Sequence, residues 1–440
     1  MLYNIILIYY TYVVNNMNVR FYTLGCKVNQ YESEQMRCLL EKSPLADTDV
    51  DIYIVNSCTV TAESSRKTRQ ALNRIRKDNP DSVLVLTGCY PQAFPEEAAQ
   101  TVADIVTGNR SNIKIVELIF SFLQTGKRVI AVEDHEKNET YTEFAIDDFS
   151  GHTRAFIKIQ DGCNRFCSYC IIPYARGRSR SRKLEDIEAE LKTLASKGYR
   201  EVVLTGIDLS VYGADIGCDL ADAVTLAQSI DGIDRIRLGS LEPDKMTGMQ
   251  LSRFADCDKF CPQFHLSLQS GSDAVLKRMN RHYTSTEYAN LCEQIRTQFA
   301  DAVITTDIIT GFPGETEEDF SQTIEFVKQI GFEKVHVFPY SERSGTRAVQ
   351  FDGRVEKKVR EARARELTQV CNKIRQQFLL SQIGKTVEVL FETPKNGIQQ
   401  GFTANYTPVQ VVGRENLCGR TLPVYITAAE YDACIGELTE

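Results

Sequence analysis

The sequence predicts an α/β protein with an N-terminal parallel sheet, a central partial (β/α) barrel and a small C-terminal all-β barrel. Three observations support this fold class. Apolar, strand-like segments alternate with helical segments between Val19 and about residue 130, and again from Arg154 onward. Such alternation is typical of parallel sheets that helices cover on both faces. After Gly384 the pattern changes to short strands and turns, and 440 residues suffice for three parts of this size.

The first part, residues 17–130, has three predicted strands, each followed by a predicted helix. The strands are VRFYTLGC, DIYIVNSC and SVLVLTGC, and the helices are ESEQMRCLLEK, SSRKTRQALNRIRK and PEEAAQTVADI. Residues 131–152 are polar and acidic, which predicts a linker to the second part. Residues 1–16 are interpreted as an extension ahead of Met17, with a short membrane-associated segment as the alternative.

The second part, residues 150–380, contains six predicted strands. They are AFIKIQ, EVVLTGID, RIRLGS, QFHLSLQS, AVITTDIITG and KVHVFPYS, with helical segments such as LEDIEAELKTLASKG between them. Reactive side chains follow nearly every strand, which favours a barrel, because barrel enzymes carry their functional groups at the strand ends. Periodicity alone leaves a doubly wound open sheet as the alternative. A long amphipathic helix that ends at Gly384 leads into the third part, residues 381–440.

A CxxxCxxC motif, formed by Cys163, Cys167 and Cys170, follows the first strand of the second part. Three thiolates in one loop can hold three irons of a cube-shaped 4Fe–4S cluster and leave the fourth iron open to a small molecule. Structural zinc sites take four protein ligands, and ferredoxin-type electron carriers use four cysteines for each cluster. The motif therefore predicts a cluster that binds a substrate.

Three further cysteines, Cys26, Cys58 and Cys89, each lie at the carboxyl end of a strand in the first part. These ends converge on the ligand crevice of an open α/β sheet. Because neighbouring strands are about 4.8 Å apart, three of them can deliver three thiolates to one site. No local spacing motif marks this set, so three buried cysteines remain the alternative. The remaining cysteines are interpreted as buried or incidental thiols: Cys38, Cys218, Cys257, Cys261, Cys292, Cys371, Cys418 and Cys434.

Composition and charge exclude several classes of protein. The chain has no apolar run that could span a bilayer and no signal-peptide pattern, which predicts a cytoplasmic protein without a membrane partner. A disulfide scaffold is typical of short secreted chains, whereas clustered cysteines in a reducing compartment hold metal. The net charge of −8 argues against indiscriminate coating of nucleic acid. Basic runs at residues 64–77, 162–183 and 354–376 nevertheless favour a polyanionic substrate.

The segment IQDGCNRFCSYCIIPYARG resembles the signature of the radical S-adenosylmethionine (SAM) methylthiotransferases. Further segments resemble blocks of the same family: FYTLGCKVNQYESE, NSCTVT, LTGCYPQ, LTGID, SLQSGSDAVLKRMNRHYT, DIITGFPGETEEDF and HVFPYSERSGTRA. Together they cover most of residues 20–375 in order. QGFTANYTPVQV is similar to the core of TRAM, the small RNA-binding β-barrel that ends these enzymes.

The resemblance implies SAM and two 4Fe–4S clusters as cofactors. A radical-forming cluster would lie on the CxxxCxxC motif, and an auxiliary cluster would lie on Cys26, Cys58 and Cys89. SAM would be contacted from strand ends, and the candidate residues are Gly206, Glu242, Gln269 and Asp307. Each of these four also has an ordinary structural interpretation, as a turn, capping or network residue.

The implied reaction inserts a methylthio group at an unactivated carbon, a step that cofactors supply and the protein positions. In the family, one-electron cleavage of SAM yields a 5′-deoxyadenosyl radical, which abstracts hydrogen from carbon 2 of an adenine. Sulfur carried on the auxiliary cluster, methylated by a second SAM, is then inserted. The reaction requires an external electron donor, and the sequence leaves the sulfur donor unknown.

GCKVNQYESE and HVFPYSERSGTRA most resemble the branch that modifies N6-threonylcarbamoyladenosine next to the anticodon of tRNA. The alternative branches act on isopentenyladenosine in tRNA or on an aspartate of a ribosomal protein. Two alternatives come from other classes: an iron–sulfur electron carrier, and an RNA-binding module with structural cysteines. The predicted barrel disfavours the electron carrier, which needs no such scaffold. The two separate cysteine triads disfavour an RNA-binding module with structural cysteines.

Overall fold

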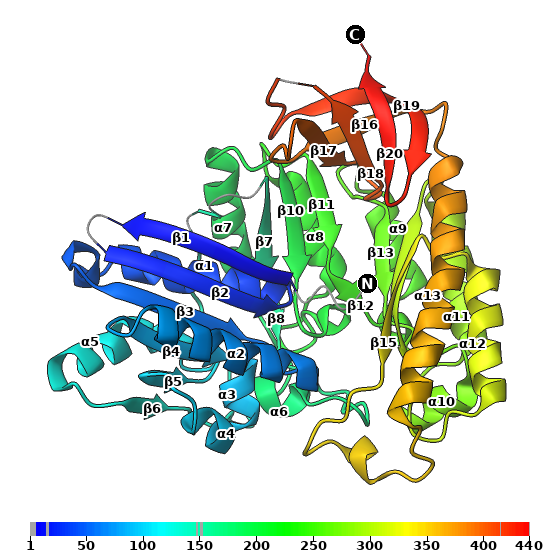
Figure 1. The fold of residues 1–440 in the computed structure, drawn as a ribbon. Coiled ribbons are helices and arrows are strands. Elements are labelled where there is room, and N and C mark those ends of the chain that lie inside the picture. The colour runs from blue at the N-terminus through cyan, green and yellow to red at the C-terminus, as the bar shows by residue number, and fades with distance from the viewer. Residues whose placement is uncertain (1–5, 15–16, 147, 150–152, 414, 440) are drawn as a thin grey trace.

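The computed structural model describes residues 6–14, 17–146, 148–149, 153–413 and 415–439 (Figure 1). Within these residues, the N-terminal part is a six-stranded sheet whose strands lie in chain order. The first strand is antiparallel to the second, and the others are parallel, which confirms the predicted parallel sheet. The strands are β1 (Ile6–Val14), β2 (Met17–Gly25), β3 (Asp51–Ser57), β4 (Val83–Gly88), β5 (Ile105–Thr107) and β6 (Val129–Ala131).

The predicted extension before Met17 contributes an edge strand to this sheet. Strand β1 pairs with β2 along its whole length, from Ile6 opposite Gly25 to Val14 opposite Met17. Among the helices of the described residues, none is long and apolar enough to cross a bilayer.

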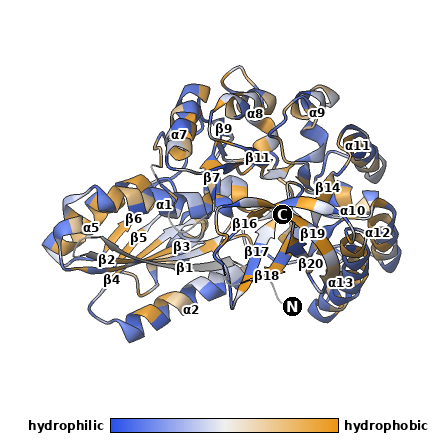
Figure 2. Ribbon diagram, turned by 90° about the horizontal axis from the view of Figure 1, so that it is seen from above, coloured by the Kyte–Doolittle hydropathy of each residue, from blue (hydrophilic) through white to orange (hydrophobic). Residues whose placement is uncertain are grey.

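Helices cover both faces of the N-terminal sheet, as predicted. Strand β3 shows this by alternation: Ile52 and Ile54 pack in the core on one face, and Tyr53 and Val55 pack in the core on the other. One face carries α1 (Lys27–Glu41), η1 (Pro44–Asp47), η2 (Asn112–Lys114) and α5 (Ile115–Thr125), and the other carries α2 (Ala62–Asp78), α3 (Cys89–Ala93) and α4 (Pro95–Ala99). Figure 2 shows α1 and α5 on one side of the sheet and α2 on the other. Because β2, β3 and β4 are neighbours, the crossovers through α1 and α2 have opposite hands, so one departs from the right-handed rule.

One predicted helix of the first part is much shorter in the structure. The segment PEEAAQTVADI was predicted as a single helix, but α4 ends at Ala99 and β5 begins at Ile105. The β-branched residues of β5 favour a strand. The carboxylate of Asp104 accepts the Leu84 backbone N–H at 2.8 Å and so starts β5 beside β4. Helix α5 was not predicted from the sequence.

The predicted linker is anchored in the protein core near its end. After β6 ends at Ala131, the described residues up to position 149 form no helix or strand. Ile146 and Phe149 are nevertheless fully buried in the central core. The Tyr31 hydroxyl of α1 donates to the Phe144 carbonyl at 3.2 Å. The end of this segment therefore packs between the N-terminal sheet and the barrel, whereas many of its polar residues are exposed, as their composition suggested.

The central part is a partial barrel of parallel strands, as predicted. Its strands form two sheets, ordered β11-β10-β7 and β12-β13-β14-β15. A bridge between Ile236 and Phe260 joins them, and β11 runs into β12 at Gly239. The strands are β7 (Arg154–Lys158), β10 (Glu201–Thr205), β11 (Arg235–Leu238), β12 (Ser240–Leu241), β13 (Gln263–Leu266), β14 (Val303–Thr310) and β15 (Lys334–Pro339).

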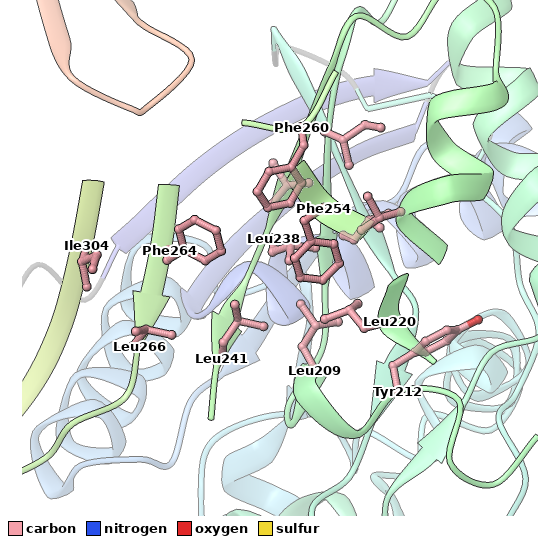
Figure 3. Packing of buried hydrophobic residues seen from close by; sticks show 14 of the residues in the cluster. Leu209, Tyr212, Leu220, Leu238, Leu241, Phe254, Phe260, Phe264, Leu266 and Ile304 are labelled. Carbon is pink, nitrogen blue, oxygen red and sulfur yellow. The ribbon is translucent and has the colours of Figure 1, made fainter. Parts of the chain in front are cut away.

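Helices surround this barrel on its outer side, where they form an arc in the view from above (Figure 2). The arc consists of α7 (Leu184–Ser196), α8 (Leu220–Ser229), α9 (Gly248–Ala255), α10 (Asp273–Arg278), α11 (Ser285–Gln298), α12 (Glu317–Ile330) and α13 (Lys357–Leu380). The central part also contains the short helices α6 (Ile172–Arg176), η3 (Leu209–Val211), η4 (Pro243–Lys245) and η5 (Arg347–Gln350), of which α6 contacts α3 of the N-terminal part. Helix α13 is the predicted long helix, and it ends four residues before Gly384. Figure 3 shows the apolar core between strands and helices, where Phe254 and Phe260 stack at 5.0 Å.

The C-terminal part is a closed barrel, as predicted, and its strands are β16 (Thr386–Phe391), β17 (Ile398–Phe402), β18 (Pro408–Val412), β19 (Thr421–Glu430) and β20 (Ala433–Leu438). It sits at the amino ends of the central strands (Figure 1). Arg235 donates to the Phe402 carbonyl at 3.0 Å, and Arg237 donates to the Thr403 carbonyl at 2.8 Å. The guanidinium of Arg154 lies 5.0 Å from the centre of the Tyr406 ring. Arginines at the strand starts therefore fasten this barrel to the central one.

We predict that Phe264→Ala destabilises the protein by about 3–5 kcal/mol, because truncation of a large buried side chain leaves a cavity. Phe264 is fully buried on β13, and its ring lies 5.6 Å from Phe260 and 5.2 Å from Phe299. The control is Met249→Ala, at a side chain that is 76% exposed, where a change below about 0.5 kcal/mol is expected. Urea denaturation followed by circular dichroism measures both. Equal destabilisation by the two variants would contradict this account of the core.

Candidate functional site

The CxxxCxxC loop is closed at its base by a short antiparallel ladder, β8 (Gln160–Asp161) with β9 (Arg180–Ser181). Gly162 follows the ladder with φ +73, and a Cβ there would lie 1.9 Å from the Arg178 carbonyl oxygen. Only glycine therefore allows the loop to turn back on itself at this point. The loop places all three cysteines of the motif after the first barrel strand, as the sequence predicted.

The thiols of this loop are close to one another and to charged side chains. The Arg165 backbone N–H donates to Cys163 Sγ at 3.4 Å, and the Cys170 N–H donates to the Cys167 carbonyl at 2.9 Å. Burial, followed by the neighbouring Cys167, raises the pKa of Cys170 to about 12. Burial likewise raises the pKa of Cys163, and the Asp208 carboxylate adds to that rise. The metal-free Cys163 and Cys170 thiols are thus neutral, and a bound metal would have to displace their protons.

Two residues that sequence reasoning missed contact these cysteines directly. Asp208 Oδ2 lies 3.5 Å from Cys163 Sγ, and the other carboxylate oxygen of Asp208 is buried with no hydrogen-bond partner among the described residues. Burial raises the pKa of Asp208 to about 6, and Glu242 contributes. Arg281 donates to Cys167 Sγ at 3.3 Å and pairs with Glu242. The signal for Asp208 was its place in LTGID, directly after a barrel strand.

The four candidate SAM contacts fall into two groups. Glu242 lies near the cysteine loop, because it pairs with Arg281, which donates to Cys167 Sγ. Gly206 has a backbone role: a Cβ there would lie 2.8 Å from Gln160 Oε1, which accepts the Ile207 and Asp208 N–H groups.

Gln269 and Asp307 form the second group: Gln269 follows β13, and Asp307 lies within the neighbouring strand β14. The Gln269 N–H donates to the Asp307 carbonyl at 2.9 Å, and Gln269 has φ +73. Asp307 Oδ2 lies 3.2 Å from His265 Nε2. The SAM-binding role of all four residues stays a prediction.

The three strand-end cysteines of the N-terminal sheet lie on neighbouring strands. Cys26 follows β2, Cys58 follows β3 and Cys89 begins α3 after β4. A Cβ on Gly25 would lie 3.0 Å from Cys58 Cβ, which shows how closely the first two strand ends approach. The side chain of Asn29 links the same strand ends. Its Oδ1 accepts the Cys26 thiol at 3.4 Å, and its Nδ2 donates to the Ser57 carbonyl at 3.0 Å.

These thiols differ in exposure. Cys26 is exposed and Cys89 is buried, and burial raises the pKa of Cys89 to about 12 although the nearby Arg176 opposes the rise. Burial also raises the pKa of Cys58. Next to Cys26, the ammonium of Lys27 lies 5.9 Å from the centre of the Phe156 ring of β7, so this strand end faces the barrel.

The donor sets of both triads suit iron–sulfur clusters. Within the described residues, no three His, Cys, Asp or Glu side chains converge on a point that could hold a single metal ion. A cuboidal cluster binds each thiolate at a separate iron, so its ligands need not converge in that way. Three cysteines on one loop and three on adjacent strand ends match such a donor set.

The basic run at residues 162–183 is largely internal, which corrects its interpretation as a surface for a polyanion. Arg176 and Arg182 are at most 1% exposed, and Arg180 is buried as well. Each is paired with a carboxylate, as Arg182 is with Glu190. The exposed cations of this run are Arg178 and Lys183. In the run at residues 64–77, Arg66, Arg69, Arg74 and Lys77 of α2 are exposed.

Comparison with known proteins identifies the class of enzyme. The family model of the radical SAM superfamily matches residues 157–327, and that of the uncharacterized protein family UPF0004 matches residues 18–108. A solved structure of TsrM, a radical SAM methyltransferase from Kitasatospora setae, aligns with a TM-score of 0.50 at 17% identity, over 70% of this chain and 64% of that chain. At this identity the likeness shows the fold alone. The fold and the three-cysteine loop define a radical SAM enzyme.

Curated relatives narrow the class to one family. Threonylcarbamoyladenosine tRNA methylthiotransferase MtaB of Bacillus subtilis is 36% identical over 94% of both chains, and that of Aquifex aeolicus is 38% identical over 85% of this chain and 92% of its own. The tRNA-2-methylthio-N(6)-dimethylallyladenosine synthase of Clostridium novyi is 35% identical over 96% of this chain and 97% of its own. The chain belongs to the radical SAM methylthiotransferase family, and its cofactors are SAM and 4Fe–4S clusters.

We predict that Gly162→Ala prevents iron binding at the CxxxCxxC loop, because the added Cβ collides with the Arg178 carbonyl. Gly126→Ala is the matched control, since Gly126 has φ +62 and a Cβ there meets nothing within 4 Å. That control should cost about 1 kcal/mol in backbone strain and leave iron binding unchanged. Iron analysis after anaerobic reconstitution, with circular dichroism as a folding check, measures both. Full iron content in the Gly162 variant would contradict this role.

Proposed function

We propose that this enzyme converts N6-threonylcarbamoyladenosine next to the anticodon of tRNA into its 2-methylthio derivative. The observation that supports it most is the joint presence of two cysteine triads in a chain 36–38% identical to curated MtaB enzymes. We assign the radical-forming cluster to Cys163, Cys167 and Cys170, and the auxiliary cluster to Cys26, Cys58 and Cys89. A tRNA substrate supports a cytoplasmic location for the reaction.

The proposal gives each part of the chain a role. Residues 17–130 would present the auxiliary cluster, residues 150–380 would bind SAM and initiate the radical, and residues 381–440 would contact RNA as a TRAM-like barrel. When bound, the clusters and SAM supply the electron transfer and the radical that an unactivated carbon–hydrogen bond requires. An external electron donor and a sulfur donor complete the partners.

The chain's own side chains position and enclose these groups. Asp208 places an acceptor against Cys163, and Arg281 places a donor against Cys167. Cys26 is the exposed thiol of the second triad and lies on the barrel side of the sheet, where sulfur must be delivered. Gly206, Glu242, Gln269 and Asp307 remain our candidates for SAM contacts.

Contact with tRNA is supported by exposed cations and by the substrate's single-stranded loop. Arg66, Arg69, Arg74 and Lys77 of α2 can neutralise phosphates and so supply affinity that falls with salt. Such contacts position RNA without reading its sequence. An adenosine in an anticodon loop can be turned out toward the barrel without opening a duplex.

We predict that the two triads have separable functions. A variant with Cys26, Cys58 and Cys89 replaced by Ala should hold about four of eight irons and still cleave SAM to 5′-deoxyadenosine. It should form no methylthiolated product, because the auxiliary cluster is missing. The matched variant with Cys163, Cys167 and Cys170 replaced by Ala should also hold about half of the iron but should cleave no SAM. Iron analysis and chromatography of 5′-deoxyadenosine measure this, and SAM cleavage by the second variant would refute the assignment.

The substrate is tested by the nucleosides of bulk tRNA. Deletion of the gene should remove 2-methylthio-N6-threonylcarbamoyladenosine and leave the unthiolated precursor, as mass spectrometry of digested tRNA can show. Restoring the gene should restore the product, and restoring the CxxxCxxC triple-Ala variant should not. If the isopentenyl-type methylthio nucleoside disappeared instead, or a ribosomal protein lost its modification, the branch would be wrong while the family would stand.

A further inference from the structure

Arg176 is a fully buried arginine that links the two cysteine triads. It is the last residue of α6, the short helix that follows the CxxxCxxC loop, and it is 0% exposed. Its Nε lies 3.2 Å from Cys89 Sγ, and its Nη2 donates to Glu32 Oε2 at 2.9 Å and to Asn29 Oδ1 at 3.1 Å. A side chain of the barrel part thus extends into the triad of the N-terminal sheet.

The backbone around Arg176 is tied to both triads at the same time. The Gly177 carbonyl accepts the N–H of Cys163 at 3.1 Å. The Ala175 carbonyl accepts Asn109 Nδ2 at 2.7 Å, and the same Nδ2 lies 3.8 Å from Cys89 Sγ. Gly177 has φ +69, and a Cβ there would lie 2.8 Å from His135 Cγ. Residues 175–177 therefore connect a ligand of one proposed cluster to a ligand of the other through hydrogen bonds.

Carboxylates hold the guanidinium of Arg176 in this orientation. Glu32 pairs with both Arg176 and Lys158, and Asp161 lies 2.6 Å from Lys158 and 3.2 Å from Arg180. With its Nη groups occupied by oxygen acceptors, Arg176 directs its Nε–H at the Cys89 sulfur. Hydrogen bonds to the ligand sulfurs are among the features that set the reduction potential of an iron–sulfur cluster.

We propose that Arg176 is a positioning residue that hydrogen-bonds the Cys89 ligand of the auxiliary cluster and holds that cluster against the radical-forming loop. The inference rests on the proposed function, because it requires the auxiliary cluster. A donor to a ligand sulfur stabilises the more negative, reduced cluster and so raises its midpoint potential. The network around Arg176 also sets the separation of the two clusters.

The test uses the full chain with Cys163, Cys167 and Cys170 replaced by Ala, so that only the auxiliary cluster is present. Arg176→Lys is compared with Arg182→Lys in this background. Arg182 is a suitable match because it is 1% exposed and pairs with the buried Glu190, and its hydrogen-bond partners among the described residues are oxygen atoms. Iron content and a redox titration followed by electron paramagnetic resonance are measured for the parent and both variants.

Arg176→Lys should shift the midpoint to a lower potential, so that the ratio of reduced to oxidised cluster at the parent's midpoint falls about tenfold, the loss expected for one charge-assisted hydrogen bond. Arg182→Lys should leave the midpoint unchanged. Selective loss of iron from the Arg176 variant would also support the proposal, because it shows that Arg176 acts on the cluster site.

Equal behaviour of the two lysine variants, in iron content and in potential, would overturn the proposal and leave Arg176 a packing residue. Absence of iron from the parent would overturn the auxiliary-cluster assignment itself, and this inference with it. In the enzyme with both triads intact, Arg176→Lys should still cleave SAM but should form less methylthiolated product for each SAM cleaved. Unchanged product per cleavage would show that the network does not set the separation of the clusters.

Discussion

Arg176 and Glu32 form a buried ion pair across the boundary between the barrel and the N-terminal sheet, and each side chain is almost wholly excluded from water. A buried ion that loses its partner costs several kcal/mol, so the two parts cannot shift or separate without a large penalty. Arg176 also lies beside Cys89, and the next residue, Gly177, accepts the Cys163 N–H with its carbonyl. The relative placement of the two cysteine triads therefore depends on this one charge pair and the carboxylates and cations around it.

A second arginine fastens the opposite edge of the barrel. The partial barrel ends at β7 on one side and β15 on the other, and the N-terminal sheet lies across this open side (Figure 2). After β15, Arg343 donates to Thr59 Oγ1 at 2.7 Å and to Ser65 Oγ at 3.1 Å, and its guanidinium lies 4.6 Å from the Phe94 ring centre. The N-terminal sheet therefore contacts the barrel at both of its edges, near β7 and after β15. In a full barrel, these edges would be closed by strand pairing instead.

Much of this architecture could be predicted from the sequence, because it depends on patterns of residues that are close together in the chain. Apolar strands, helical periodicity and the CxxxCxxC spacing identified both α/β parts and one cysteine site. The strand-end position of Cys26, Cys58 and Cys89 predicted a second site, and the structure places them on adjacent strands. Two features escaped prediction because they depend on tertiary contacts: the opposite hands of the first two crossovers, and the burial of the polar linker through Ile146 and Phe149.

Charge was the least reliable guide, for a physical reason. A count of arginines cannot tell a guanidinium that faces solvent from one that a distant carboxylate neutralises inside the fold. Arg176, paired with Glu32, which is 144 residues away in sequence, is such a case. The Asp208 carboxylate was missed for the related reason that its neighbour, Cys163, comes from another strand end.

The position of the C-terminal barrel constrains how an RNA could bind. This barrel is fastened to the amino ends of the central strands through Arg235 and Arg237, whereas the cysteine loop follows the carboxyl end of β7. The longest strand between these ends, β14, has 8 residues, which corresponds to about 26 Å at the usual rise of an extended chain. An RNA that contacts the C-terminal barrel and also presents a base to the cysteine loop must therefore extend along the side of the central barrel. The exposed cations of α2, which we propose contact phosphates, lie on the N-terminal sheet that covers this side.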